Sequence, residues 1–363
     1  MRMRSVVVLV VLLFCSILWA RDIDEISFGT AVSFEAVTWN TEWFPLNGET
    51  TINYVSQIVE ALDVDFLAFQ EIDNFSSFAQ MIEDLTNFDG YYVDSEYSGL
   101  AFIYKPNTVT ISEIYEIYTT QSYWRPFPRS PLVVELQFMN ENFILINNHF
   151  KCCGDGYIDW GDNWDEEKRR YDASVLLKEY IDENFPNENV IVLGDLNDEI
   201  TDASSDNVFQ PFFDDDANYR FADMEVAEGS SADWSYPTWP SHIDHILVTN
   251  ELFDELENAT IETIKIDEFM SGGWNQYENN ISDHRPVALK IEFNNTIYGD
   301  VDGNGEVQAY DASLVLQNVI ELIDFNENQI FTADVDGNGI IQAYDASLIL
   351  QYVVGIIDEF PID

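Results

Sequence analysis

The chain has 363 residues, of which 46% are hydrophobic and 14% aromatic, so it can build one large packed domain and a small one, and global disorder is excluded. Its formal net charge of −52 repels nucleic-acid backbones and anionic membranes at long range, which excludes a tight, sequence-reading DNA-binding protein. No lysine or arginine follows Lys290, and this change of composition indicates a domain boundary.

The first twenty residues have the pattern of an export signal. Arg2 and Arg4 precede the apolar run 6–13, and Ala20 precedes a polar stretch. The run is too short to span a bilayer, so we predict a signal peptide over 1–20 and a secreted protein, free or associated with the cell surface. An uncleaved N-terminal anchor is the alternative. No later segment has the length and apolarity of a membrane span.

Cleavage after Ala20 would remove Cys15 and lower the formal charge from −52 to −54, because two arginines are lost with the signal. The remaining cysteines, Cys152 and Cys153, are adjacent in the chain. They can form a vicinal disulfide in an oxidising compartment or remain two free thiols. In either case the stability of the fold must come from its core.

Residues 31–293 mix strand and helix patterns along one stretch. Runs of β-branched and aromatic residues bounded by Asn, Asp, Gly and Pro predict strands at 34–39, 100–104, 143–146, 190–193, 243–248 and 286–291. Apolar residues at helical spacing predict helices over 53–62 and 166–181. We therefore predict an α/β domain with sheet layers inside and helices outside.

Acidic, amide and histidine side chains lie at the ends of these strands. Those that follow a strand or an apolar run are Asn40, Glu42, Glu71, His149, Asp195 and Asn197. Those at the start of the last two predicted strands are Asp244, Asp283 and His284. All four histidines of the chain, including His242 and His245, fall in these motifs beside carboxylates. In a chain so poor in histidine, this placement favours roles in titration or metal binding.

Phosphodiester hydrolysis requires this mixture of side chains. A divalent ion held by carboxylate and amide oxygens neutralises the phosphate oxygens and the leaving oxygen. A histidine with a near-neutral pKa accepts the proton of the attacking water, and a neighbouring carboxylate orients the imidazole. Singly each acid is more simply a solvated turn residue, but the ordered set favours a catalytic site.

The order of three motifs resembles that of the endonuclease/exonuclease/phosphatase superfamily, which includes pancreatic-type deoxyribonucleases, apurinic endonucleases and bacterial sphingomyelinases. The motifs are Gln70-Glu71, Gly194-Asp195-Leu196-Asn197 and Ser282-Asp283-His284-Arg285-Pro286. The resemblance covers about residues 33–293. It implies a four-layer α/β sandwich, with two packed sheets flanked by helices, and a phosphodiester hydrolase that uses Mg²⁺ or Mn²⁺.

The resemblance also implies roles for single residues. The implied metal ligands are Asn40, Glu42, Glu71 and Asp283. His284 resembles the general base and Asp244 the carboxylate that orients it. Asp195 and Asn197 resemble the pair that orients nucleophile and phosphate. His149 resembles a phosphate ligand or general acid, and Arg129 resembles an arginine that contacts phosphate.

Two features depart from the family pattern, and a third is a loop that follows one of its motifs. No acid aligns as the partner of His149, and Glu96 or Tyr97 could take that place. His245 stands where the family often has tyrosine, and we expect it to fill space and not to contact substrate. The loop that begins at Lys151 is expected at the rim of the site, where its two tryptophans, Trp160 and Trp164, could stack on a base or a sugar or pack locally.

Residues 299–357 contain a duplicated loop. Each copy has the oxygen-bearing side chains of a calcium loop at positions 1, 3, 5 and 12, and a glycine, Gly305 or Gly339, at position 6. The predicted calcium ligands are Asp300, Asp302, Asn304 and Asp311 in the first loop and Asp334, Asp336, Asn338 and Asp345 in the second. An apolar helical run follows each loop. We predict a small all-α module of loop–helix, loop–helix form that binds two Ca²⁺ ions.

The duplicated loops resemble a type I dockerin. The resemblance implies docking on a cohesin-bearing scaffold or cell-surface protein. Ala309-Tyr310 and Ala343-Tyr344 occupy the positions that contact cohesin in that family, where Ser-Thr is more familiar, so the identity of the partner stays open.

Four hypotheses about function follow. We favour a secreted nuclease acting on DNA or RNA, and a phosphatase or a phospholipase of the sphingomyelinase type is the alternative, since the same site serves both. The net charge argues against long polyanionic substrates, and no apolar membrane-binding hairpin is evident. A catalytically inactive binding subunit fits poorly with the near-complete site. A polysaccharide-degrading enzyme would give the histidine motifs no role.

Overall fold

The computed structural model describes residues 22–30, 33–93, 99–139, 141–292 and 297–362. The predicted signal 1–20, with Cys15, therefore lies outside the described residues, as do Glu96, Tyr97 and the predicted domain limits at 31 and 293. None of the helices in the described ranges combines the length and the apolar character that a membrane crossing needs.

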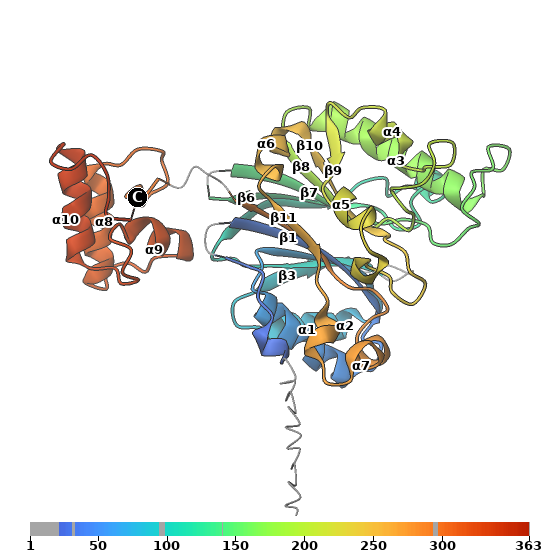
Figure 1. Ribbon diagram of the computed structural model, residues 1–363, viewed down its shortest axis with the longest axis horizontal. Helices are drawn as coiled ribbons and strands as arrows, with labels where there is room; N and C mark the ends of the chain where they lie inside the picture. The colour runs from blue at the N-terminus through green and yellow to red at the C-terminus, as the bar shows by residue number, and fades with distance from the viewer. Residues whose placement is uncertain (1–21, 31–32, 94–98, 140, 293–296, 363) are drawn as a thin grey trace, which may run out of the picture.

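Two six-stranded sheets lie face to face in the described part of the chain (Figure 1). The first sheet has the order β11 (Thr260–Thr263), β12 (Val287–Glu292), β1 (Ser33–Phe44), β2 (Phe66–Ile72), β4 (Gly99–Tyr104) and β3 (Asp89–Tyr92). The second has the order β5 (Val109–Glu116), β6 (Leu132–Phe138), β7 (Glu141–His149), β8 (Asn189–Asp195), β10 (Asp244–Thr249) and β9 (Tyr219–Phe221). The pairs β1–β2 and β7–β8 are parallel, and the other pairs are antiparallel.

Helices cover both outer faces of the sandwich (Figure 1). The first sheet packs against α1 (Glu49–Leu62), α2 (Phe75–Asp84) and α7 (Gly273–Asn280), and the second against α3 (Glu166–Asn184) and α4 (Gln210–Phe213). The short helices α5 (Met224–Ala227) and α6 (Phe253–Leu256) lie in connections, as do 3-10 turns at Ile23–Glu25, Gln121–Tyr123, Ser231–Asp233, Asn250–Leu252 and Ile266–Phe269. The predicted four-layer α/β sandwich is confirmed.

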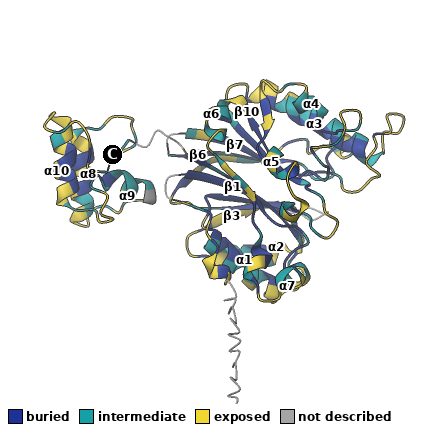
Figure 2. Ribbon diagram, in the orientation of Figure 1, coloured by how far each residue is buried: buried dark blue, intermediate teal, exposed yellow. Residues whose placement is uncertain are grey.

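Side-chain alternation along the central strands builds the layers. In β1, Phe34 and Ala36 face the second sheet, whereas Val37 and Trp39 face the helices. Successive side chains of a strand point to opposite faces, so a strand buried on both faces is apolar throughout, as Figure 2 shows for the sheet centres. Each fully buried Phe or Leu side chain contributes about 1.5–3 kcal/mol to stability.

The predicted helix 166–181 begins with a cap that its sequence explains. The Asp165 side chain accepts the N–H of Lys168, and two further acids in the first turn face the positive end of the helix dipole. All six predicted strands and both predicted helices are present. The strands β10 and β12 are displaced by one residue from their predicted positions, and the other elements are one to six residues longer than predicted. The elements that were not predicted are β2, β3, β5, β6, β9, β11, α2 and α7, together with the short helices.

The C-terminal helices α8 (Ala309–Val319), α9 (Glu327–Ala333) and α10 (Ala343–Val353) share a core of their own. The helices after the two loops, α8 and α10, are those predicted. The prediction omitted α9, a seven-residue helix whose start is fixed by a reciprocal capping pair, Asn326 and Gln329. The predicted loop–helix, loop–helix form therefore gains a third helix between its two halves.

Candidate active site

The inter-sheet layer changes from apolar to polar at one end of the sandwich. In β1, Thr38 and Asn40 continue the row of Phe34 and Ala36, and in β8 Asp195 continues the row of Leu193. Strand pairing brings the polar ends together, because Asp195 pairs with Asp244 on one side and with His149 on the other. The predicted strand-end residues therefore converge on one region.

A buried hydrogen-bonded layer separates the apolar core from this region. Gln70 donates to Thr38 Oγ1 over 3.0 Å and to Asn147 Oδ1 over 2.8 Å, so the chain of bonds crosses from the first sheet to the second. Asn147 in turn donates to the backbone oxygens of Phe69 and Ala101. Buried amides satisfied in this way fix the spacing of the sheets below the site. Sequence reasoning did not identify Asn147.

Asp195 lies at the centre of the polar region. Its Oδ2 accepts a hydrogen bond from Asn40 Nδ2 at 2.8 Å and lies 3.4 Å from His149 Nε2, while its Oδ1 accepts the N–H of Asn197 at 3.1 Å. Burial, together with the charges of Asp244 and Glu71, raises the pKa of Asp195 to about 7, although His284 and Asn40 oppose this. A carboxyl that titrates near neutrality can orient a water molecule or a phosphate in either protonation state.

His284 and Asp244 form a buried pair. The His284 Nδ1 lies 2.7 Å from Asp244 Oδ2, so Nδ1–H donates to the carboxylate and Nε2 faces Asp195, at 4.0 Å, and Asp283, at 3.8 Å. Burial lowers the His284 pKa, but the three surrounding carboxylates raise it to about 10. The geometry is that of an oriented imidazole whose second nitrogen, Nε2, points toward other acids.

Two side chains hold the backbone of His284 in place. Ser282 Oγ donates to Asn40 O at 2.6 Å and accepts the N–H of His284 at 2.9 Å. Tyr277, buried on α7, donates its hydroxyl to the His284 carbonyl oxygen at 2.6 Å, and Trp39 Nε1 contacts both groups. The segment that leads into β12 is therefore attached to β1 and to α7.

Glu42, Glu71 and Asp283 are among the acids that line the cleft, together with His149 and His284. Burial and the charges of Asp283 and Glu71 raise the pKa of Glu42 to about 7. Its buried Oε2 has no hydrogen-bond partner within the described part of the chain. The charge of His284 offsets part of this repulsion, and three hard oxygen donors gathered in this way fit a divalent cation.

Asn40 orients these groups through its amide nitrogen. Its Nδ2 faces Glu71 Oε1 at 3.3 Å as well as Asp195, and its Oδ1 accepts the N–H of Glu42 at 2.9 Å. Asn40 would offer oxygen to a cation only with its amide in the opposite orientation.

His149 and Arg129 lie on the other side of Asp195. Burial and the nearby charges of Arg129 and His284 lower the pKa of His149 well below its usual value, so the imidazole is neutral at pH 7. Its Nδ1 has no hydrogen-bond partner among the residues that the structure describes. Burial lowers the Arg129 pKa, and the charges of Glu71 and Asp195 act in the opposite direction. A neutral imidazole beside a guanidinium can donate a hydrogen bond to a phosphate oxygen.

The cleft has a volume of about 600 Å³ and is bordered by residues that sequence reasoning did not select. Trp43 and Tyr236 line it, and the Tyr236 ring lies 4.8 Å from the His284 ring. Arg170 bonds Asp198 Oδ2 at 2.9 Å and the carbonyl oxygens of Lys151 and Cys153 at 2.7 Å. The loop after His149 is therefore at the rim of the site, as expected.

Cys152 and Cys153 lie in that loop as exposed free thiols, with their sulfur atoms 2.9 Å apart. The two tryptophans for which stacking on substrate or local packing was left open are not among the residues that line the cleft. Trp160 packs edge-on against Tyr171, and Trp164 packs against Trp124. Local packing therefore accounts for both.

The two remaining histidines form a separate buried group. Asp223 Oδ2 lies 2.9 Å from His242 Nε2 and 2.6 Å from His245 Nδ1, and His245 Nε2 lies 2.9 Å from the backbone oxygen of Asp198. Both ring nitrogens of His245 face acceptors, so His245 is doubly protonated. His242 Nδ1 accepts the N–H of Ser235, so Nε2 is the nitrogen that donates to Asp223. As expected, His245 is inside the fold and away from the cleft.

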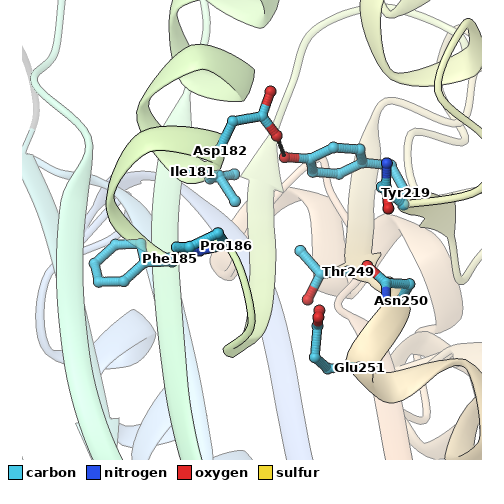
Figure 3. Close-up of a pocket in the computed structure, with 9 residues that line it drawn as sticks. Ile181, Asp182, Phe185, Pro186, Tyr219, Thr249, Asn250 and Glu251 are labelled. Carbon is cyan, nitrogen blue, oxygen red and sulfur yellow. Dashed lines mark hydrogen bonds between the residues drawn. The ribbon is translucent and has the colours of Figure 1, made fainter.

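A second, smaller hollow of about 140 Å³ lies where α3 ends beside β9 and β10 (Figure 3). Tyr219 donates its hydroxyl to Asp182 Oδ1 at 2.6 Å across its mouth. The described residues that line it include no histidine and no basic side chain. The larger cleft is therefore the better candidate for chemistry.

The duplicated loops are folded for cation binding. Gly305 and Gly339 have φ of 88° and 78°, the left-handed conformation that a sharp turn at position 6 requires. In the first loop Asp300 accepts the N–H groups of Asn304 and Gly305, while Asp311 accepts those of Val301 and Asp302. One oxygen each of Asp300, Asp302 and Asp311 lies within 4.8 Å of the others. This hard oxygen set fits Ca²⁺.

Residues 37–284 match the model of the Endonuclease/Exonuclease/phosphatase family, and residues 298–354 match that of the dockerin type I domain. No curated protein sequence matches the chain.

Three solved structures share the fold of the larger part. A crystal structure of D. rerio TDP2 complexed with single strand DNA product is 15% identical, with a TM-score of 0.55 over 72% of this chain and 99% of that one. The human Nocturnin catalytic domain with bound sulfate anion is 15% identical, with a TM-score of 0.52 over 72% and 94% of the two chains. The Bacteroides thetaiotaomicron mannosyl-6-phosphatase is 17% identical, with a TM-score of 0.51 over 72% and 100%.

Proposed function

The chain belongs to the endonuclease/exonuclease/phosphatase family, and from this membership we propose that it is a divalent-metal-dependent nuclease that hydrolyses phosphodiester bonds by in-line attack of water. The observation that carries the proposal is the pair His284–Asp244, joined over 2.7 Å, whose free nitrogen faces a cleft lined by Glu42, Glu71 and Asp283. An oriented imidazole opposite a cluster of hard oxygen donors is the arrangement that metal-assisted hydrolysis requires.

The donor set fits one Mg²⁺ or Mn²⁺ ion. Glu71, Glu42 and Asp283 would hold it through carboxylate oxygens, and Asn40 through its amide oxygen in the opposite amide orientation. Bound there, the cation would neutralise phosphate oxygens, stabilise the leaving oxygen and lower the pKa of His284 toward neutrality.

The chain's own residues supply the rest of the chemistry. Neutral His284 accepts the proton of the attacking water at Nε2, and Asp244 stabilises the imidazolium that forms. Asp195 and Asn197 orient the water and the phosphate, since both lie at the cleft beside His284. His149 and Arg129 contact a non-bridging phosphate oxygen, where a buried neutral imidazole and a guanidinium both donate.

A phosphatase or phospholipase of the same fold is the second candidate. The net charge of −52 favours it, because a small phosphoester experiences less long-range repulsion from the protein than a polynucleotide does. The catalytic residues would keep the same roles.

We also propose a division into a signal peptide over 1–20, a catalytic domain over 31–293 and a dockerin domain over 299–357 that binds two Ca²⁺ ions. The dockerin would attach a secreted enzyme to a cohesin-bearing scaffold or cell-surface protein. Tyr310 and Tyr344 support this role, since each occupies the second position of its helix, α8 or α10, and is more than half exposed.

A substrate panel tests the proposal. Purified protein with Mg²⁺, Mn²⁺ or Ca²⁺ is offered plasmid DNA, RNA, a phosphomonoester and sphingomyelin, and the wild type is compared with His284→Ala. We expect a phosphodiester to be cleaved, chelation by EDTA to abolish cleavage, and His284→Ala to lower kcat by at least ~10²-fold. Unchanged turnover in His284→Ala would contradict the general-base assignment. Cleavage of the phosphomonoester alone would favour the second candidate.

A further inference from the structure

Trp43 presents an uncovered ring at the mouth of the catalytic cleft. It lies at the end of β1, lines the cleft beside Glu42 and Glu71, and is 66% exposed. Neither the fold nor the proposed hydrolysis step uses this ring. The next residue, Phe44, is fully buried, so the ring is attached to a rigid strand and not to a loose loop.

The backbone holds Trp43 in this position at an energetic cost. Glu42 and Trp43 have φ of 37° and 53°, in the left-handed region that side chains other than glycine rarely adopt. The Trp43 N–H donates to Glu71 Oε2 at 3.2 Å, which ties the turn to the proposed metal-binding carboxylate. Strained backbone of this kind persists where the surrounding structure fixes it, and it is concentrated at functional sites.

Two other exposed tryptophans, Trp160 and Trp164, provide a contrast. The Trp160 ring packs on Tyr171 with Lys168 over it, and the Trp164 ring packs on Trp124 with Arg169 over it. Among the residues that the structure describes, none places an aromatic ring or a cation against the ring of Trp43. Its π face is therefore available to a ligand.

We infer that Trp43 is a stacking platform for the base of an unpaired nucleotide whose phosphodiester lies at the carboxylates Glu42, Glu71 and Asp283. This inference rests on the proposed nuclease function and narrows its substrate to single strands and strand ends, because a base inside a duplex is already stacked. Proteins that bind single strands combine stacking with a basic groove. Here the cleft is lined by many acids, so the non-ionic stacking contact takes a larger share of the affinity.

Dinucleotides that contain one phosphodiester test the inference, since the scissile bond is then known. Thymidylyl-thymidine is compared with two analogues in which one base or the other is replaced by hydrogen. Each is assayed with wild type, Trp43→Ala, Trp43→Phe and the matched surface control Trp164→Ala. Trp43→Ala is expected to lower kcat/KM for the complete dinucleotide about tenfold, and to have no effect on the analogue that lacks the stacked base.

The controls separate stacking from damage to the site. Trp43→Phe should restore part of the loss, Trp164→Ala should match the wild type, and the effect of Trp43→Ala should be the same at low and high salt. Equal losses on all three dinucleotides, or no loss on any, would overturn the inference. If the wild type cleaves no dinucleotide but cleaves a phosphomonoester, the nuclease proposal itself fails, an outcome distinct from the others.

Discussion

Asp223 carries a buried charge that the fold requires but the chemistry does not use. Burial acts against its ionisation, yet His245 and His242 lower the pKa of Asp223 well below its usual range, and Asp223 in turn raises the pKa of buried His245. Through His245 the network supports the backbone of Asp198, the residue that directly follows Asn197. The charged pair therefore maintains the loop that carries Asn197.

Replacing Asp223 by Asn should destabilise the protein by ~3 kcal/mol, because it leaves the His245 charge buried without its partner. The contribution of Asp223 is present above its unfolded pKa of 3.8 and is lost as the pH falls through its lower folded pKa. That of His245 is complete below its unfolded pKa of 6.5 and is lost as the pH rises through its higher folded pKa.

Urea unfolding of wild type and Asp223→Asn measures this difference. The gap in unfolding free energy should therefore be widest between pH 3.8 and 6.5. A difference that does not change with pH would mean that the pair is not ionised as described. Asp182→Asn, at the exposed hollow of Figure 3, serves as a surface carboxylate control.

At the scale of elements, α7 acts on the catalytic region through one hydroxyl. Tyr277 donates to the carbonyl oxygen of His284, and its removal leaves that oxygen with the weaker contact from Trp39 at 3.3 Å. Tyr277→Phe should lower kcat about tenfold with little change in KM, because a misplaced base affects the transition state more than substrate binding.

Steady-state kinetics of Tyr277→Phe, with circular dichroism as a check on folding, tests this link. Tyr54→Phe on α1 is a suitable control, since among the residues that the structure describes its hydroxyl bonds only Gln276. An unchanged kcat in Tyr277→Phe would show that the His284 backbone is held by other contacts.

Sequence patterns were sufficient for most strands that carry the site, but not for β2, which carries Glu71, nor for several strands outside the site. The strands that end in Asp195 and His149 are continuous apolar runs followed by polar residues, so both their type and their catalytic ends could be predicted. The edge strands β3 and β11 are four-residue segments with mostly exposed side chains, and α7 is largely polar with a single fully buried residue, Tyr277. Such elements are defined by their neighbours and not by local periodicity.

The same limit applies within the site. Carboxylates and histidines could be selected because their chemistry stands out beside a strand. Trp43, Asn147 and Asp223 could not, because an aromatic ring, an amide or a single acid has many local uses. Their roles depend on which residues lie around them in the folded chain, and only the packed structure supplies that information.

At the scale of the whole molecule, two different acidic sites coexist in one chain. The cleft gathers carboxylates beside histidines, whereas the duplicated loops gather carboxylates around backbone N–H groups. Without cations both sets carry unbalanced negative charge. Divalent ions are therefore expected to stabilise each part separately.

Calorimetric titration with Ca²⁺ tests the duplicated loops. Wild type should bind two ions, and Asp311→Ala and Asp345→Ala should each remove one, because each of these acids closes its loop at position 12. Ser347→Ala, beside the second loop on α10, should leave both sites intact. A chain that ends at residue 293 and still binds two Ca²⁺ ions would contradict the placement of the sites.

The central claim is that separate strand ends bring Glu71 and His284 to a common cation and phosphate. The most direct test measures Mn²⁺ binding and phosphodiester hydrolysis together in wild type, Glu71→Gln and His284→Ala, with enough Ca²⁺ present to fill the two loops. We predict that Glu71→Gln loses both the Mn²⁺ ion and hydrolysis, whereas His284→Ala retains the ion and loses hydrolysis. Mn²⁺ binding and turnover in Glu71→Gln that equal those of the wild type would contradict the account.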